Sequence, residues 1–202
     1  MNLYLNKLND LQSLFLLYAE DFYGWYAANR QEYPGEFDAQ VLPLLESILA
    51  DKSGKLHRKT PEEARILDRA VTDFWFCYCA SLEPSEVKVV EGGFYAWRCH
   101  DAREIIEKYA SRTMLQRWDW MIEGRTLAQT TFDHQFVSPE DYLCWIGYWT
   151  PEEIASLNAE MKKVREMMSE AEYEMHQIPI DCVQRALGVA LESRMGLILD
   201  VS

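Results

Sequence analysis

The stretch TPEEIASLNAEMKKVREMMSEAEYEM, residues 150–175, decides the fold class because it predicts one long amphipathic helix. Thr150 can cap this helix, Pro151 suits its first turn, and Glu153 completes a capping box. Apolar residues then recur at steps of three and four, at Ile154, Leu157, Met161, Val164, Met168, Ala171 and Met175. We expect the helix to pack on neighbouring helices. The alternative is a coiled-coil seam over residues 154–175 that joins copies of the chain into a homo-oligomer.

Helical spacing predicts further helices on both sides of this stretch. Thr60-Pro61-Glu62-Glu63 repeats the same helix start, and Gly196 suits the position that follows a last helix. Residues 126–136 fit either a strand or a loop. We therefore expect helices over residues 8–30, 37–50, 60–82, 101–109, 114–122 and 181–194, with a short one after Ser138.

Two segments follow the period of a strand instead. Residues 87–97 hold alternating valines, then Gly92-Gly93, then an aromatic run, which predicts a β-hairpin. Residues 197–201 read as a buried terminal strand. Because we find no repeat and no linker, we predict a single domain over residues 1–202. It is a mainly helical α+β fold with about six or seven helices and a small sheet made of the hairpin and the terminal strand.

Composition excludes several classes of protein. The 202 residues are 49% hydrophobic and 26% charged, as in globular domains. The 33 acidic and 20 basic side chains give a net charge of −13, which disfavours nucleic acid as a partner. The longest run without a charged residue is ten residues long, against the roughly 20 that a membrane span needs. Residues 1–7 lack the features of a secretory signal. We therefore expect a cytoplasmic protein without membrane contact.

The five cysteines predict thiols rather than disulfides, because their number is odd and most have apolar neighbours. They are Cys77, Cys79, Cys99, Cys144 and Cys182. A zinc site built from Cys77, Cys79 and Cys99-His100 is disfavoured, since helical residues two apart point away from each other. Glu172 and His176, four residues apart, are more typical of a surface ion pair than of a metal site completed by Asp133-His134. We expect no metal.

No motif identifies an enzyme. Cys99 and Cys144 lie in no nucleophile signature, and the chain has no glycine-rich phosphate loop. The catalytic residues of any activity therefore stay unknown, no cofactor is expected, and the protein is more typical of a non-enzyme.

The leading functional hypothesis comes from charge. Residues 126–202 hold 13 acidic and 5 basic side chains. Glu166, Glu170 and Glu174 follow a spacing of four, which places them on one helix face. Such a face is either merely solvated or docks a basic protein partner. We predict the second, in an acidic binding protein of which one form is an immunity-type inhibitor of a nuclease toxin.

The alternative is an enzyme or a small-molecule binder with an aromatic-lined pocket. Its wall would be formed by Trp118, His134, Trp145 and Trp149, with Cys99 or Asp133 for chemistry. The same rings can instead fill the core of a helical domain.

Two carboxylates interrupt apolar helices. We expect Asp21 and Asp73 to face solvent. If either is buried, it needs a partner such as Arg98, Arg103 or Arg117.

One segment resembles a known family. Gly147-Tyr148-Trp149-Thr150-Pro151-Glu152-Glu153-Ile154 is followed by a helix and by the ending Gly196-Leu197-Ile198-Leu199. In these features residues 145–201, a little over a quarter of the chain, resemble the YfbM-like group of uncharacterised bacterial proteins. That group shows a Tyr-x-Thr-Pro-Glu-Glu-Val helix start and a C-terminal strand led by glycine. The resemblance implies an α+β fold in a bacterial protein and carries over no activity and no catalytic residue.

Overall fold

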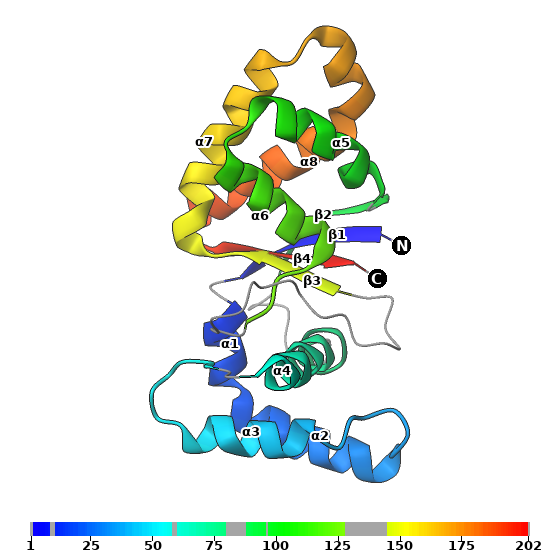
Figure 1. Ribbon diagram of the computed structural model, residues 1–202, viewed down its shortest axis with the longest axis vertical. Coiled ribbons are helices and arrows are strands. Elements are labelled where there is room, and N and C mark those ends of the chain that lie inside the picture. The colour runs from blue at the N-terminus through cyan, green and yellow to red at the C-terminus, as the bar shows by residue number, and fades with distance from the viewer. Residues whose placement is uncertain are drawn as a thin grey trace. The chain divides into compact units, whose positions relative to one another are not determined.

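The computed structural model describes residues 2–8, 11–57, 60–79, 88–95, 97–127 and 145–201 (Figure 1). The chain divides into two compact units. The single domain over residues 1–202, which we expected because the sequence shows no repeat and no linker, stays a prediction. The sheet unit combines Met1–Leu11, Pro84–Arg125 and Leu143–Ser202, and the helical unit combines Gln12–Glu83 with Thr126–Tyr142. Neither unit is one continuous segment, so no single linker marks their boundary in the sequence.

The sheet unit is built on four antiparallel strands in the order β2-β1-β4-β3. They are β1 (Asn2–Leu8), β2 (Lys88–Tyr95), β3 (Trp145–Trp149) and β4 (Gly196–Val201). The predicted terminal strand is confirmed as β4. It pairs with β1 on one side, where Leu5 lies opposite Leu199, and with β3 on the other.

The predicted hairpin over residues 87–97 is wrong, because β2 runs through Gly92 and Gly93 as one strand. Leu3 of β1 pairs with Phe94, but Leu5 pairs with Glu91. One extra residue of β2 is therefore accommodated between these pairs. Glycines commonly mark such bulges, because they tolerate the irregular backbone. The glycine pair that indicated a turn thus lies at an irregularity inside a strand.

Four helices lie on one face of this sheet (Figure 1). They are α5 (Trp97–Tyr109), α6 (Arg112–Glu123), α7 (Pro151–Met167) and α8 (Glu170–Ser193). Their apolar faces form one core with β3 and β4, which includes Ile106, Met161, Val183 and Leu199. This close packing requires a glycine at position 147 in β3. A Cβ atom there would lie 2.5 Å from the carbonyl oxygen of Trp120 in α6.

The single helix predicted over residues 150–175 is wrong. Helix α7 ends at Met167, and Met168 has an extended backbone with ψ of 138°. Ser169 then caps α8 and forms a capping box with Glu172. This second box restarts the helix in a new direction, so the heptad-like seam is broken after Met168. Helix α8 is therefore longer than the predicted 181–194, and a left-handed Arg194, rather than Gly196, ends it.

The helical unit contains α1 (Leu11–Leu17) from its second residue onward, α2 (Ala19–Glu32), α3 (Val41–Ala50), α4 (Pro61–Asp73) and the π-helical turn η1 (Phe74–Tyr78). The helix predicted over 8–30 is thus two helices, which divide at Tyr18. The capping box of Thr60 and Glu63 is confirmed at the start of α4. Edge-to-face rings form the centre of this unit, with Phe15 and Phe22 5.2 and 5.3 Å from Phe74.

Asp73 is completely buried in this unit, so its predicted exposure is wrong. Its carboxylate accepts hydrogen bonds from Arg69 Nε at 2.9 Å and from the Tyr26 hydroxyl at 3.1 Å. The partner is therefore an arginine one turn earlier on α4, not one of the three distant arginines considered from the sequence. Asp21, in contrast, is exposed as expected.

The predicted fold class is confirmed as mainly helical α+β. The described segments contain eight α-helices, slightly more than predicted. None of these helices is both long and apolar enough to cross a membrane.

Candidate functional site

The aromatic residues predicted to line a pocket lie in the core where their side chains are described. Trp118 and Trp149 are 0% and 1% exposed. Trp118 Nε1 donates to the carbonyl oxygen of Cys99 and Trp149 Nε1 to that of Arg117, both at 3.0 Å. These bonds tie α5, α6 and β3 together, which is a structural role. For Trp145 only the main chain, in β3, is described, and Asp133 and His134 lie outside the described residues.

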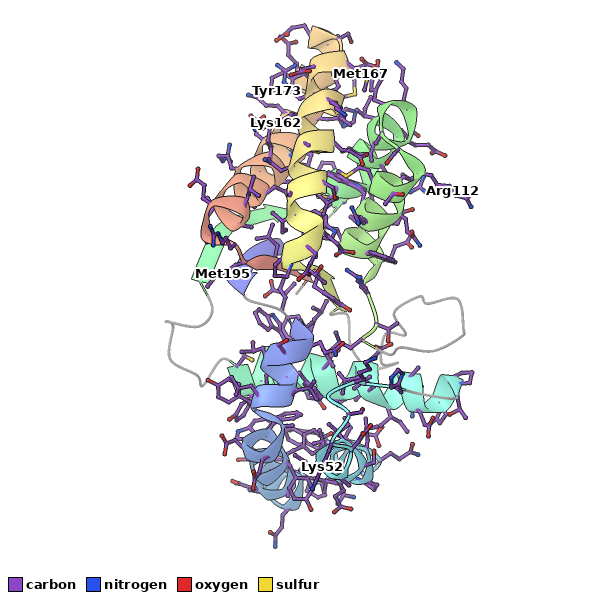
Figure 2. All side chains as sticks on the ribbon, turned by 90° about the vertical axis from the view of Figure 1, so that its left-hand side faces the viewer. Lys52, Arg112, Lys162, Met167, Tyr173 and Met195 are labelled. Carbon is purple, nitrogen blue, oxygen red and sulfur yellow. The ribbon has the colours of Figure 1, made fainter. Side chains whose placement is uncertain are left out.

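The three glutamates predicted to share a helix face lie on two helices. Glu166 is near the end of α7, whereas Glu170 and Glu174 are in the first turns of α8. All three are exposed around the turn that joins the helices. Two exposed methionines are their neighbours in the chain, Met167 at 49% and Met175 at 74% exposure. Figure 2 labels Met167 at this turn, with Tyr173 nearby. The glutamates therefore surround a tip with apolar side chains.

The cysteines show no reactive arrangement among the described residues. Cys99 is fully buried, and burial raises the pKa of its thiol far above the ordinary value, with a smaller contribution from Cys182. A thiol of this kind is not a nucleophile at neutral pH. Cys77 and Cys79 are half-buried in the helical unit, and Cys144 lies outside the described residues. No three His, Cys, Asp or Glu side chains in the described segments are grouped closely enough to hold a metal ion.

Glu172 forms an ion pair with Lys108 of α5, where the sequence suggested His176. Lys108 Nζ donates to the Glu172 carboxylate at 2.7 Å, and the Tyr109 hydroxyl donates at 3.0 Å. The bond from Lys108, together with those from Ser169, lowers the pKa of Glu172 from 4.5 to about 2. The same carboxylate closes the capping box of α8. Glu172 thus links α5 to α8.

A surface hollow of about 430 Å³ lies between α5 and α8 and is called the α5/α8 hollow below. Its walls are Trp97, Arg98, Asp101, Glu104, Met175, His176 and Pro179. Trp97 is 53% exposed, and the Arg98 guanidinium lies 5.0 Å from its ring. The sequence analysis missed Trp97 as a surface residue because it assigned this ring to the hairpin. The structure instead places it at the first position of α5.

A second hollow, of about 350 Å³, lies between α7 and α8 and is called the α7/α8 hollow. Its walls combine Gly188 and Leu191 with charged and amide side chains, which are Asn158, Lys162, Asp181, Gln184, Arg185 and Glu192. Asn158 is only 6% exposed, and its Oδ1 atom has no hydrogen-bond partner among the described residues. The sequence held one signal for this hollow: the polar residue Asn158 directly follows Leu157, which belongs to the apolar stripe of the helix.

A third polar cluster supports the start of α7. Arg125 lies between the rings of Trp120 and Tyr148, at 4.1 and 4.4 Å, and donates to the Glu153 carboxylate at 2.7 Å. Glu153 also accepts from the Thr150 main-chain N–H at 2.9 Å, as the predicted capping box requires. The cluster is largely buried and internally satisfied, so we assign it a structural role.

Comparison of the chain with protein-family models, with curated proteins and with solved structures finds no match. The resemblance of residues 145–201 to the YfbM-like group therefore stays a prediction, and any function must be argued from the surface of this chain alone.

Proposed function

We propose that this protein is a binding protein that docks a basic protein partner through the α5/α8 hollow and the adjoining tip of α7 and α8. The observation that carries the proposal is the pair of large exposed apolar side chains, Trp97 and Met175, on either side of one hollow. A half-exposed tryptophan beside a methionine is typical of the anchor residues that dominate the energy of protein interfaces.

The charge around these anchors supports a basic partner. Asp101 and Glu104 line the hollow, and Arg98 is the one permanent cation among its described walls. Glu170 and Glu174 continue the acidic surface along the first turns of α8, and Glu166 adds a carboxylate across the turn. Acidic groups at the rim of an apolar patch increase the association rate with a basic surface and select against acidic ones.

One form of this function is the immunity-type inhibitor of a nuclease toxin in the bacterial cytoplasm. A nuclease needs a basic face to bind the phosphates of its substrate, and that face is a target for an acidic protein with an apolar anchor.

The two other hypotheses from the sequence find less support. The aromatic pocket would need Trp118 and Trp149 to be accessible, but both are buried. A homo-oligomeric scaffold would need a free seam, but Ile154, Leu157, Met161 and Val164 are each at most 1% exposed within their own unit.

The test is affinity capture of the full chain from its native lysate at low and at high salt, with identification by mass spectrometry. We compare Trp97→Ala, which removes the anchor, with the triple reversal Glu166→Lys, Glu170→Lys, Glu174→Lys. The matched controls are Leu49→Ala and the reversal of Glu32, Glu36 and Glu46, which are exposed residues of the helical unit. The second control alters the net charge equally, so it separates contact at the tip from attraction by overall charge.

We expect one basic protein to be enriched, and we expect its binding to be weaker at high salt. Trp97→Ala should reduce its binding by more than about tenfold, as for an anchor residue. The tip reversal should reduce it more than the control reversal does. Capture that is equal in all variants, or a partner without an excess of basic residues, would contradict the proposal.

A further inference from the structure

We propose that the basic partner inserts an arginine side chain into the α5/α8 hollow, where its guanidinium replaces Arg98 on the ring of Trp97. This inference rests on the proposed function, because it takes the partner to be a basic protein that docks at this hollow. It adds the chemical group that is recognised, and it assigns to Arg98 the role of an internal competitor. The hollow's volume of about 430 Å³ is within the range of sites that hold small molecules, so a single side chain fits inside it.

The first step of the argument is the contact between Arg98 and Trp97. The guanidinium carbon of Arg98 lies 5.0 Å from the centre of the Trp97 ring, which is a cation–π distance. The ring stays 53% exposed with Arg98 in this place. A planar guanidinium stacks on an aromatic face, whereas the ammonium of lysine is a compact and strongly hydrated charge. The chain's own side chain therefore indicates which group this ring accepts.

The second step is that little else holds Arg98 in place. Its guanidinium has no ion pair and no side-chain hydrogen bond within the part of the chain that the structure describes. Arg103, on the same helix, donates to Asp119 at 2.7 Å and to Glu107 at 3.1 Å. A single cation–π contact at the surface is weak. Arg98 can therefore leave the ring without breaking an ion pair, whereas Arg103 cannot leave its partners in this way.

The third step is the pair of carboxylates beside the ring. Asp101 and Glu104 follow Trp97 at steps of four and three, so all three side chains share one face of α5 and line the hollow. Neither carboxylate has an ion pair with any described residue. An incoming guanidinium can therefore stack on the ring and donate to a carboxylate at the same time. Met175, which lines the hollow from α8, offers an apolar surface for the methylene stem of that side chain.

The probe in the experiment is a short peptide of arginines, compared with peptides of lysines and of uncharged citrullines. The full chain is labelled with fluorotryptophan, and fluorine NMR at low salt follows the resonance of Trp97, which is identified by its loss in Trp97→Phe. Arg98→Gln removes the internal competitor. Its matched control is Arg112→Gln, which removes an exposed cation at the start of α6 that is labelled in Figure 2.

A second pair of variants tests the carboxylates. Asp101→Asn combined with Glu104→Gln removes both negative charges from the hollow. The matched control combines Glu32→Gln with Glu36→Gln, which are exposed residues of the helical unit. Both double variants change the net charge equally, so the comparison separates contact in the hollow from attraction by overall charge.

We expect Arg98→Gln, but not Arg112→Gln, to shift the Trp97 resonance before any peptide is added. The arginine peptide should then move this resonance saturably, the lysine peptide should bind at least about threefold more weakly, and the citrulline peptide should not move it. Arg98→Gln should bind the arginine peptide about threefold more tightly than Arg112→Gln does. The double carboxylate variant should bind it about fivefold more weakly than its control does.

Three results would overturn the proposal. The first is a Trp97 resonance that does not respond to the arginine peptide. The second is equal binding by Arg98→Gln and Arg112→Gln, which would remove the role of Arg98 as a competitor. The third is equal binding of the lysine peptide, which would assign the hollow to cations in general.

These results are distinguishable from a failure of the proposed function. A basic protein whose capture depends on Trp97, but is not strengthened by Arg98→Gln, would keep the proposed function and contradict this inference. An arginine peptide that binds as expected, to a chain that captures no basic protein, would support the recognition of a guanidinium and contradict the proposed function.

Discussion

Two identical tetrapeptides, Thr-Pro-Glu-Glu, start helices in this protein, but their last residues have different surroundings. Glu63 closes the capping box of α4 at an exposed position near Thr60. Glu153 closes the box of α7 and is only 14% exposed, with Arg125 and Arg117 beside its carboxylate. Glutamine can replace glutamate in a capping box but cannot pair with a guanidinium. Glu153→Gln should therefore destabilise the fold by about 2 kcal/mol, and Glu63→Gln by less than about 0.5 kcal/mol.

Urea unfolding of both variants, followed by circular dichroism, measures the difference. Arg125→Met serves as a second variant, because it removes the charge partner from the other side while leaving the capping box intact. If Glu63→Gln and Glu153→Gln lower the midpoint equally, the cap dominates and the cluster at Arg125 contributes little.

Predictions for single residues succeeded where the determinants are local. The capping boxes of Thr60 and Thr150 need only side chains three positions apart, and both are present. The burial of Asp73 could not be found in this way, although its partner Arg69 lies only four positions earlier. Tyr26 is 47 positions away, and the burial of the whole cluster depends on aromatic packing between α2 and η1. Trp118 is a similar case. The sequence left open whether its ring fills the core or lines a pocket, and only the burial of the side chain in the fold distinguishes the two.

At the scale of the elements, Glu172 is the link whose strength should depend on pH. Its hydrogen bonds to Lys108 and Ser169 lower the pKa of its carboxyl group to about 2. A carboxylate whose pKa is lower in the folded than in the unfolded state stabilises the fold above its unfolded pKa, near 4.5. This stabilisation is lost as the pH falls from about 4.5 towards 2. The attachment of α8 to α5 should weaken over the same range.

Glu172→Gln retains the capping box with Ser169 but removes the charge. The unfolding midpoint of this variant should therefore fall less steeply than that of the unmodified chain between pH 4.5 and 2. Thermal unfolding across this range measures it. Glu170→Gln, an exposed change at the start of the same helix, is the control. Parallel curves for the unmodified chain and Glu172→Gln would show that another group carries the pH dependence.

Elements were predicted well when their periodicity was uninterrupted and poorly where it was ambiguous. Helix α6 and strand β4 lie close to their predicted bounds. Strand β1 was missed, although its apolar residues alternate, because its partners β2 and β4 are more than 80 positions away in the sequence. The break at Met168 was missed because Ala171 and Met175 continue the helical spacing across it. A serine followed three residues later by glutamate was the local signal for a new helix start.

At the scale of the whole molecule, the order of the chain is a poor guide to where its charge lies. The sequence suggested that acidity is concentrated in residues 126–202. By unit, the sheet unit has 18 acidic and 13 basic side chains, and the helical unit has 15 and 7. The larger excess of acidic residues therefore lies in the helical unit and not in the unit that contains most of residues 126–202. The reason is that Thr126–Tyr142 groups with the helical unit. Long-range attraction of a basic partner is therefore a property of the whole chain. Specific contact must come from local features such as Trp97.

The two ends of the chain meet in the centre of the sheet. Strands β1 and β4 are antiparallel neighbours, with Leu3 opposite Val201, and the marks for the ends lie close together in Figure 1. Among the described strands, β2 pairs with β1 alone and β3 with β4 alone, so all four strands depend on this pairing. A covalent bridge between the ends should therefore be compatible with the fold, whereas the order in which the strands are synthesised should not matter.

A circular permutant tests this arrangement directly. A short glycine-serine linker joins Ser202 to Met1, and new ends open between Ser53 and Gly54, in the exposed turn after α3 where Gly54 has a φ of +68°. We expect this permutant to keep the helical circular dichroism and cooperative unfolding of the unmodified chain, because exposed turns tolerate new ends and no strand is cut. The control opens the chain between Lys162 and Lys163 inside α7, which interrupts a helix of the core and should abolish cooperative unfolding. The result that would contradict this arrangement is a permutant opened at Gly54 that is unfolded while the unmodified chain is folded. The central pairing of β1 with β4 would then be wrong, since that pairing is what brings the two ends within reach of a short linker.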